Sequence, residues 1–213
     1  MSNYFLNSGN GSLMAEVAAI IVENKAYLSE IDGKIGDGDH GVNMAKGFSR
    51  AAGKLQGEES FDQSLSVLSD VLMSEIGGSM GPLYGMFFSD MADKLQGEES
   101  IDAAIYATAL SAGLKGVIEI GSAKVGDKTM LDCLVPAIEE FEQTMAGGGD
   151  FRSALKVQVT AAEKGRDSTI DLVAKVGRSS RLGERSRGVL DAGATSCCLI
   201  LSTLATGIEA RLG

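Results

Sequence analysis

Three aspartates and the chain's only histidine fall within nine residues, 32–40. Asp32, Asp37 and Asp39 offer carboxylate oxygens, the hard ligands that Mg²⁺ and Ca²⁺ prefer. Glycines between them permit a tight fold, since glycine takes positive φ without steric cost; these glycines are Gly33, Gly36, Gly38 and Gly41. Converging carboxylates repel one another unless cations lie between them. The stretch therefore indicates either a divalent-metal site or a solvated acidic turn whose aspartates cap helices.

Two other kinds of metal site do not fit this stretch. Counted from Asp37, an EF-hand would need a bidentate Glu where Phe48 stands. His40 has no second histidine and no nearby cysteine with which to bind zinc. It is then either a helix-terminal residue that stabilises the loop, or a phosphate donor or general acid–base group. Asn43 falls in the first turn of the next predicted helix, where backbone N–H groups point at any anion.

Two glycine-rich stretches follow. Residues 77–85, GGSMGPLYG, form either an anion-binding helix N-terminus or a plain interhelical turn. Residues 121–132, GSAKVGDKTMLD, nearly spell a P-loop, but Asp127 interrupts the Gly-Lys pair and no buried strand precedes it. A Walker nucleotide site is therefore excluded. We expect Asp127 to cap the next helix, with Lys128 and Thr129 in its first turn.

A longer polar stretch lies at residues 177–196, GRSSRLGERSRGVLDAGATS. It is locally basic in an acidic chain and shows no regular periodicity, which is typical of a lid or binding loop. Arg178 can present a planar fork to a phosphate. The alternative is a long solvated loop whose arginines balance the surface charge.

The elements that must position these stretches are predicted to be helices. Apolar residues recur at helical spacing, no stretch alternates with period two, and only two prolines occur in 213 residues. We expect an all-α fold of eight amphipathic helices in one domain, residues 1–213. The predicted ranges are 12–30, 41–55, 60–76, 81–95, 101–119, 127–145, 150–175 and 193–211. The repeated KLQGEES at 54–60 and 94–100 is interpreted as one helix–helix connection used twice, with its Ser capping the next helix.

Composition narrows the function classes. The formal net charge is −10 and the basic residues are scattered, so nucleic acid and anionic membranes are poor partners. The N-terminus shows no export signal, and no apolar run is long enough to span a bilayer. Three cysteines, an odd number, indicate reduced thiols and hence a cytoplasmic protein. Any phosphate chemistry needs positive charge from elsewhere, and a divalent metal supplies it.

Taken in order, IGDGDHGVNMAKGF, GGSMGPLYG, GDKTMLD and GRSSRLGERSRGVLDAGATS resemble the nucleotide-binding L subunit, or L domain, of dihydroxyacetone kinases. The resemblance covers nearly the whole chain. It implies an antiparallel barrel of eight amphipathic helices that binds ADP or ATP at one end through two Mg²⁺ ions.

The resemblance also assigns residues. It implies that Asp32, Asp37 and Asp39 hold the Mg²⁺ ions. Phosphate transfer would rest on this metal site and His40, with no catalytic residue assigned beyond them. The nucleotide would be bound by His40, Gly41, Val42, Asn43, Gly78, Ser79, Met80, Gly121, Met130, Arg178, Asp191, Ala192 and Gly193. The chain departs from the family where Ser-Met replaces Ala-Ser, at Ser79–Met80, and where Asp-Ala-Gly replaces Asp-Pro-Gly, at residues 191–193.

The resemblance implies a kinase that is incomplete alone. The hydroxyketone would be held by a separate K subunit, and a homodimer is an additional option. Phosphate would come from phosphoenolpyruvate through a phosphotransferase-system protein, with ADP retained as a coenzyme. The alternatives are an ATP-exchanging L subunit of a related ketose kinase, such as an erythrulose kinase, and a nucleotide-state sensor that binds a transcription regulator.

Overall fold

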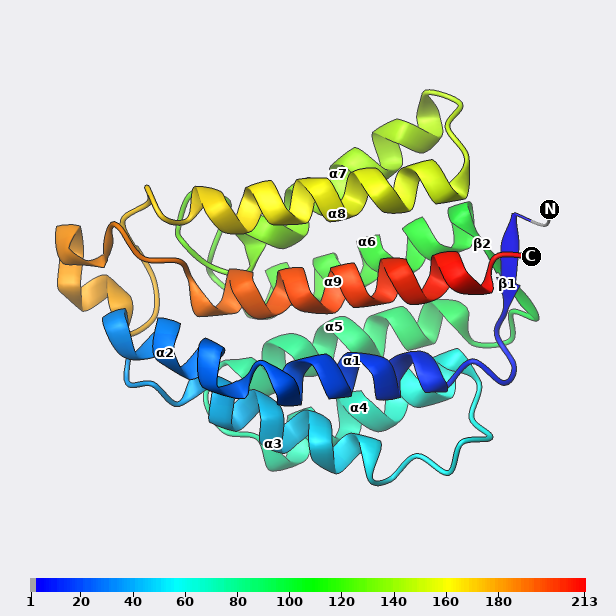
Figure 1. Cartoon of the computed structure of the whole chain (residues 1–213), viewed down its shortest axis with the longest axis horizontal. Coiled ribbons are helices and arrows are strands. Elements are labelled where there is room, and N and C mark those ends of the chain that lie inside the picture. Colours follow the sequence, from blue (N-terminus) through cyan, green and yellow to red (C-terminus); the bar gives the residue numbers. More distant parts are fainter. Residues whose placement is uncertain (1–2) are drawn as a thin grey trace.

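The computed structural model describes residues 3–213, and its helices run lengthwise beside one another (Figure 1). Apolar residues at helical spacing form the inward faces, so the interior between the helices is the hydrophobic core. In chain order the elements are β1 (Tyr4–Leu6), α1 (Ser12–Glu23), α2 (Lys25–Ile35), α3 (His40–Ala52), α4 (Phe61–Glu75), α5 (Met80–Leu95), β2 (Ser100–Asp102), α6 (Ala103–Ile120), α7 (Leu131–Ala146), α8 (Phe151–Ser168), the 3₁₀ helix η1 (Ser179–Ser186) and α9 (Ala192–Arg211).

Eight of these helices form a closed ring. From α3 to α9 each helix packs on the next one along the chain, and α1 packs on both α3 and α9. Short connections make neighbouring helices antiparallel (Figure 1). The all-α fold and the eight-helix barrel are thereby confirmed. α2 continues beyond α1 at the end of the ring away from the two termini.

The predicted helix 12–30 is in fact two helices. The chain breaks at Asn24, whose backbone has φ −88° and ψ 10° and whose side-chain amide donates to the Ile20 carbonyl at 2.9 Å. Asparagine competes in this way for backbone groups and ends helices. The helix α2 that follows reaches Ile35, five residues past the predicted end, and so carries Asp32 in its last turn. The break at Asn24 thus changes the direction of the chain just before the acidic stretch at residues 32–40.

Two short strands were not predicted. β1 and β2 pair antiparallel, with Phe5 opposite Ile101, and both of these side chains are buried. The strand β2 also corrects one capping prediction. Ser60 forms the expected capping box for α4, but Ser100 lies in β2, and Asp102 caps α6 instead by accepting from the Ile105 N–H at 2.9 Å.

Two helices, α6 and α9, are long and apolar enough to cross a membrane by length and composition alone. A core helix of a globular protein passes the same test, and 67% of the α9 window is buried, against 39% for α6. Both helices lie in the wall of the ring (Figure 1). That no membrane partner is involved stays a prediction.

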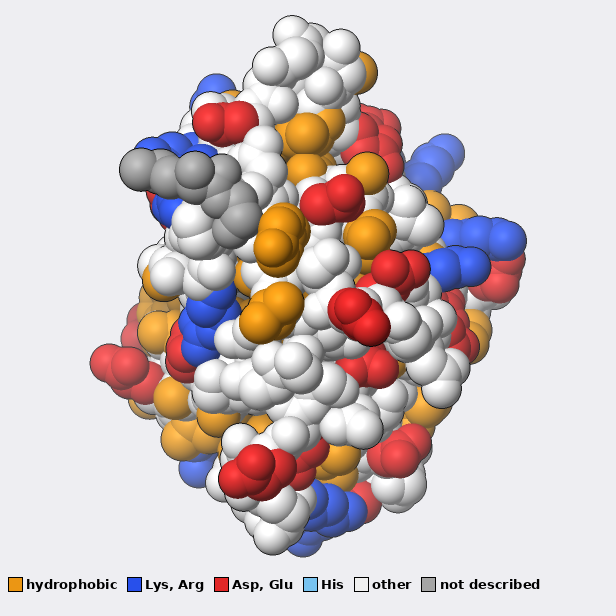
Figure 2. Space-filling model, turned by 90° about the vertical axis from the view of Figure 1, so that its right-hand side faces the viewer, with side chains coloured by type: hydrophobic (Ala, Val, Ile, Leu, Met, Phe, Trp, Pro, Cys, Tyr) orange, Lys and Arg blue, Asp and Glu red, His pale blue; other side chains and the backbone are white. Residues whose placement is uncertain are grey.

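The end of the molecule that faces the viewer in Figure 2 carries acidic and apolar side chains interspersed. Basic side chains gather there only in small groups, as far as the described residues in this view show. This distribution agrees with the net charge of −10. Large basic surfaces of the kind that bind nucleic acid are therefore not seen on this face.

Candidate functional site

A cavity of about 510 Å³ opens at the end of the ring where α2 and η1 lie. Its walls come from the α2–α3 connection, the turn before α5, the α6–α7 loop, the segment before η1 and the start of α9. Most predicted site residues line it. They are Asp32, Asp37, Asp39, His40, Asn43, Gly78, Ser79, Met80, Gly121, Met130, Arg178, Asp191, Ala192 and Gly193.

The three aspartates converge at one side of this cavity. Asp32, Asp37 and Asp39 each offer a carboxylate oxygen, and these oxygens all lie within 4.8 Å of one another. Gly38, with φ +77°, turns the backbone between Asp37 and Asp39. At Gly36 a Cβ would overlap the Asp32 carboxylate, so a larger residue there would displace this side chain. The tight turn predicted from the sequence is therefore present.

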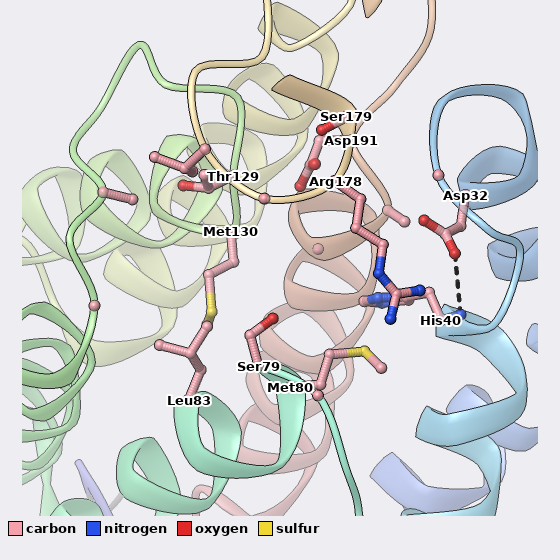
Figure 3. Close-up of a pocket in the computed structure, with 18 of the residues that line it drawn as sticks. Asp32, His40, Ser79, Met80, Leu83, Thr129, Met130, Arg178, Ser179 and Asp191 are labelled. Atoms are coloured by element: carbon pink, nitrogen blue, oxygen red, sulfur yellow. Dashed lines mark hydrogen bonds between the residues drawn. The ribbon is translucent and has the colours of Figure 1, made fainter. Parts of the chain in front are cut away.

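Arg178 provides the positive charge beside this cluster. Its guanidinium pairs with Asp37 and lies 3.7 Å from Asp39. In Figure 3 the side chain reaches across the cavity toward His40 and Asp32. The segment that carries Arg178 is fixed by buried contacts: the Ser186 hydroxyl accepts from the Ala174 N–H at 2.9 Å. Arg178 is thus held where it can contact an anion at the acidic end.

His40 is buried at the first residue of α3, only 7% exposed. Its backbone N–H donates to the Asp32 carboxylate at 3.2 Å, drawn as the dashed line in Figure 3. Its Nε2 lies 2.9 Å from the Ser196 hydroxyl, which lies 2.7 Å from the Tyr84 hydroxyl. Burial lowers the pKa of His40 to about 4, against the opposing effect of the Asp32 charge. The imidazole is therefore neutral near pH 7.

Sequence reasoning missed Ser196 and Tyr84. Both belong to stretches that were singled out, 177–196 and 77–85, but they were not assigned a role. Ser196 on α9 contacts His40 from 156 residues away along the chain, and Tyr84 on α5 contacts Ser196 from 112 residues away. No local pattern signals a contact over such a separation.

Gly41 and Val42 are not among the residues that line the cavity. A Cβ at Gly41 would overlap the Lys25 carbonyl and lie 2.6 Å from the Ser29 hydroxyl. Gly41 therefore serves the close packing of α3 on α2. Val42 is 46% exposed. The structure thus brings His40 and Asn43 of this predicted group to the cavity, but not the two residues between them.

The side of the cavity away from the aspartates is apolar. In Figure 3 the side chains of Met130 and Leu83 point toward each other, with Ser79 beside them at the start of α5. Val117 and Ile120 also line the cavity. The cavity therefore joins an apolar compartment to an acidic one, which suits a ligand that has a flat apolar part and a charged part.

The α6–α7 loop differs from its prediction. α7 begins at Leu131, so Asp127 does not cap it; instead Asp127 accepts from the Lys124 N–H at 3.0 Å and pairs with Lys175 at 3.3 Å. Asp132 organises the loop by accepting from the Gly126 N–H at 2.5 Å and the Thr129 N–H at 2.7 Å. These backbone N–H groups thus donate to a residue inside α7 rather than to a residue before it.

Lys128 is buried, 1% exposed, with φ +64°. Its ammonium donates to the carbonyls of Thr169 at 2.6 Å, Leu172 at 3.3 Å and Val189 at 2.5 Å. Burial lowers the pKa of this amine. Lys128 thereby joins the end of α8 to the segment that leads into α9, on both sides of the part of the chain that holds Arg178.

Asp191 caps α9 by accepting from the Ala194 N–H at 2.7 Å. Its own backbone N–H donates to the Thr169 hydroxyl at 3.0 Å. Burial is the main reason that the pKa of Asp191 rises to about 7, and the nearby Asp132 charge adds to the effect. The carboxyl group therefore changes its ionisation near neutral pH.

Comparison with known proteins identifies the family of the chain. The family model described as DAK2 domain matches residues 34–206. The chain belongs to the DAK2 domain family. It is 39% identical over 181 residues to the ADP-binding subunit DhaL of the PEP-dependent dihydroxyacetone kinase of Escherichia coli (strain K12), covering 84% of this chain and 86% of that one.

Two further relatives of this DAK2 protein are also named as a kinase subunit or a kinase. It is 36% identical over 187 residues to the ADP-binding subunit DhaL of the PTS-dependent dihydroxyacetone kinase of Lactococcus lactis, covering 86% of this chain and 88% of that one. It is 33% identical over 193 residues to a D-erythrulose kinase of Mycolicibacterium smegmatis, covering 89% of this chain and 33% of that protein.

A solved structure has the same fold. The dihydroxyacetone kinase of C. freundii in its native form superposes with a TM-score of 0.68 at 25% identity, covering 92% of this chain and 34% of that one. A second structure of that kinase, in complex with AMP-PNP and Mg²⁺, gives a TM-score of 0.67 at 24% identity, covering 92% of this chain and 33% of that one. The predicted family is therefore confirmed, and the DAK2 chain spans about a third of that kinase's length.

The contacts of Lys128 predict a stability effect. Lys128→Met keeps the apolar stem but leaves three carbonyls, one in a buried and two in part-buried hydrogen bonds, without this donor. The free energy of unfolding should therefore fall by about 2–4 kcal/mol. Urea unfolding measures this, and hydrogen exchange should accelerate in residues 170–190. The matched control is Lys124→Met in the same loop, where the side chain is exposed. Equal stability of the two variants would contradict this assignment.

The raised pKa of Asp191 predicts a pH effect. The folded state keeps the proton between about pH 4, where the unfolded chain loses it, and about pH 7. Stability from this group therefore falls as pH rises through that window. Asp191→Asn keeps the capping oxygen without the charge, so wild type should lose stability relative to this variant as pH rises.

Thermal unfolding of both proteins across the window measures that difference. Asp150→Asn is the matched control. Asp150 caps α8 through the Ser153 N–H at 2.8 Å, is exposed, and has its pKa lowered chiefly by hydrogen bonds from Ser153. Its difference from wild type should stay level over the same pH range. A level difference for Asp191→Asn as well would show that the folded protein does not hold the Asp191 proton.

Proposed function

We propose that this DAK2 chain is the nucleotide-binding subunit of a dihydroxyacetone-type kinase, which carries ADP or ATP with Mg²⁺ and takes part in phosphoryl transfer to a small hydroxyketone. The observation that carries the proposal is the position of Asp32, Asp37 and Asp39, within 4.8 Å of one another beside an apolar compartment. The names of the E. coli and L. lactis relatives, both ADP-binding subunits, support it.

The three carboxylates fit Mg²⁺. They are hard oxygen ligands, they converge, and Arg178 is the only cationic side chain among the described residues that pairs with them. Asp32, Asp37 and Asp39 would therefore hold the metal, as two ions in the proposal. Bound Mg²⁺ supplies positive charge that neutralises phosphate oxygens. Asp32 also accepts from the His40 N–H, which fixes its orientation toward the cluster.

The shape of the cavity orients the nucleotide. The adenine would occupy the apolar compartment between Met130 and Leu83, beside Gly121. The phosphates would then extend toward the aspartates, with His40 and Asn43 at the start of α3. Ser79 and Arg178 flank this path, and Asp191–Gly193 closes one side. Phosphoryl transfer needs this combination of fixed position and neutralised charge more than covalent chemistry.

Partners complete the proposed reaction. The chain spans about a third of the erythrulose kinase and of the C. freundii kinase, and in this proposal the nucleotide occupies the described cavity. A K subunit would therefore hold the hydroxyketone and present it at the open end of the ring. A phosphotransferase-system protein is the proposed phosphoryl donor, supported by the names of relatives. A homodimer and a cytoplasmic location stay predictions.

Exchange of ATP is the second candidate. Relatives named D-erythrulose and L-erythrulose kinases share 33% and 31% identity with this chain, without a phosphoenolpyruvate donor in their names. Against this, the relatives that the chain covers to 86% or more are named PEP- or PTS-dependent subunits. We therefore favour retained ADP that is rephosphorylated in place.

The metal assignment predicts the effect of Asp32→Asn. Removing one of three converging carboxylate charges weakens the metal site, so Mg²⁺-dependent ADP binding should fall at least about a hundred-fold while helix content stays unchanged. Calorimetric titration and circular dichroism measure the two quantities. Asp70→Asn is the control, since Asp70 is exposed on α4. ADP affinity within a few-fold of wild type would refute the assignment of Asp32 as a ligand.

The state of the nucleotide separates the two candidates. Extensively desalted protein is denatured, and any released nucleotide is identified by chromatography. We expect close to one equivalent of ADP, which indicates a retained coenzyme. Empty protein that binds added Mg·ATP would instead establish the exchanging kinase. Empty protein that binds neither nucleotide would contradict the proposed function itself.

A further inference from the structure

Arg178 pairs with two of the three carboxylates in the acidic cluster. Its Nη1 atom pairs with Asp37 and lies 3.7 Å from a carboxylate oxygen of Asp39. Asp32 instead accepts from the His40 backbone N–H at 3.2 Å. In Figure 3 the guanidinium extends into the cavity toward Asp32 and His40. The guanidinium therefore lies where the proposed metal ligands converge.

The other arginines of residues 177–196 do not reach the cluster. Among the described residues, Arg187 pairs with Glu184 at 3.1 Å, whereas Arg181 and Arg185 form no ion pair. None of these three arginines lines the cavity. Contact with the acidic cluster thus belongs to Arg178 alone within this segment, and it is not a general attraction between a basic segment and an acidic surface.

The backbone at Arg178 is held in place, while its side chain can turn. The Ser186 hydroxyl accepts from the Ala174 N–H at 2.9 Å and so fixes the segment. The side chain of Arg178 is 60% exposed, and those of Asp37 and Asp39 are 45% and 49% exposed. An ion pair between such exposed groups contributes little to stability, so one partner exchanges readily for another. Rotation of the side chain therefore suffices to separate Arg178 from the carboxylates.

The guanidinium and a divalent metal ion compete for the same oxygens. A carboxylate lone pair that accepts from a guanidinium N–H is not free to bind a metal, and Mg²⁺ needs direct oxygen ligands. The oxygens that the cluster offers all lie within 4.8 Å of one another, so a cation bound by them lies close to a guanidinium paired with Asp37. Two cations at such short range repel each other. Metal binding therefore requires Arg178 to leave Asp37.

A phosphate group offers the displaced guanidinium an equivalent partner. Arginine binds carboxylate and phosphate oxygens with the same planar fork. In the proposed function the phosphates extend toward the aspartates, and Arg178 lines their path. With metal alone, Arg178 would lose its ion pair without compensation. With metal and nucleotide together, it would exchange a carboxylate for a phosphate.

We propose that Arg178 makes metal binding conditional on the nucleotide: its guanidinium competes with the metal ion for Asp37 and Asp39, and it moves to a phosphate when Mg·ADP binds. The inference rests on the proposed function, because it takes the aspartates as metal ligands and a phosphate as the second partner of Arg178. Removal of the guanidinium then has opposite effects on two affinities. An arginine that only binds phosphate, or only stabilises the loop, would not produce this pair of effects.

Arg178→Met tests the competition with Mn²⁺ as the probe. Carboxylate oxygens suit Mn²⁺ as well as Mg²⁺, and electron paramagnetic resonance measures the free Mn²⁺ directly. On nucleotide-free protein the Mn²⁺ affinity should rise about ten-fold, because the competing cation is gone. The affinity for Mg·ADP, measured by calorimetry, should fall about ten-fold, because a phosphate loses its partner.

Arg181→Met is the matched control. It removes the same charge from an exposed position of the same segment, outside the cavity. Both affinities should stay within about two-fold of wild type in this variant. Equal Mn²⁺ affinity in Arg178→Met and Arg181→Met would overturn the proposal. Weaker Mn²⁺ binding in Arg178→Met would also overturn it, since the guanidinium would then order the carboxylates for the metal.

The proposal and the proposed function fail in different ways. Tighter Mn²⁺ binding by Arg178→Met, in protein that binds no ADP, would uphold the competition and contradict the nucleotide function. Normal binding of Mg·ADP by wild type, with no gain of Mn²⁺ affinity in Arg178→Met, would do the reverse. Absence of Mn²⁺ binding in wild type and both variants would contradict the two together. Circular dichroism identifies a variant that does not fold, and Arg178→Gln then takes the place of Arg178→Met.

Discussion

Mutual repulsion of three carboxylates is the constraint on which the site depends. Two unit charges 4.8 Å apart repel by roughly 3.5 kcal/mol at an effective dielectric constant of about 20, and solvent screening lowers this value where the carboxylates are exposed. The carboxylates stay close together despite this repulsion because Asp32 is fixed in the last turn of α2 and Asp39 lies at the start of α3. Positive charge must then be supplied from outside the cluster. Arg178 supplies part of it, and Mg²⁺ with its bound nucleotide is the proposed source of the rest.

The ring of helices keeps the apolar part of the cavity apart from the acidic part. Apolar residues of α5, α6 and α7 form one compartment of the cavity, and the α2–α3 connection forms the other. Lys128 and Asp191 hold the segment between α8 and α9 in place, so that Arg178 faces the aspartates. In the proposed function, an acidic protein would in this way bind phosphate without a basic surface. Local positive charge and helix N-termini replace it.

Much of this was accessible from the sequence, because the signals were local. Helical periodicity predicted eight helices, and the family resemblance predicted their arrangement in a barrel. The short spacing of Asp32, Asp37 and Asp39 allowed their convergence, because the glycines between them permit a tight turn. The family resemblance brought distant stretches such as Gly78 and Arg178 to one cavity. The errors were local as well: a single side-chain bond at Asn24 divides one helix, and Asp132 takes the backbone donors that Asp127 was expected to satisfy.

What the sequence does not reveal are contacts between distant positions. Ser196, Tyr84 and Lys128 each complete the site through a bond to a residue at least 41 positions away. Serine, tyrosine and lysine have no spacing rule for such bonds. The motif that the stretch around Lys128 nearly matches is a P-loop, which the sequence excluded. The strand pair β1–β2 was missed for the same reason, since its two members are too short to show alternation.

The central claim is that this chain binds ADP through Mg²⁺ at the three aspartates. The most direct test is calorimetric titration of nucleotide-free wild-type protein with ADP, once with saturating Mg²⁺ and once with EDTA. The account predicts binding near one equivalent that is about a hundred-fold or more tighter with Mg²⁺. Equal affinity under both conditions, or no binding under either, would contradict it.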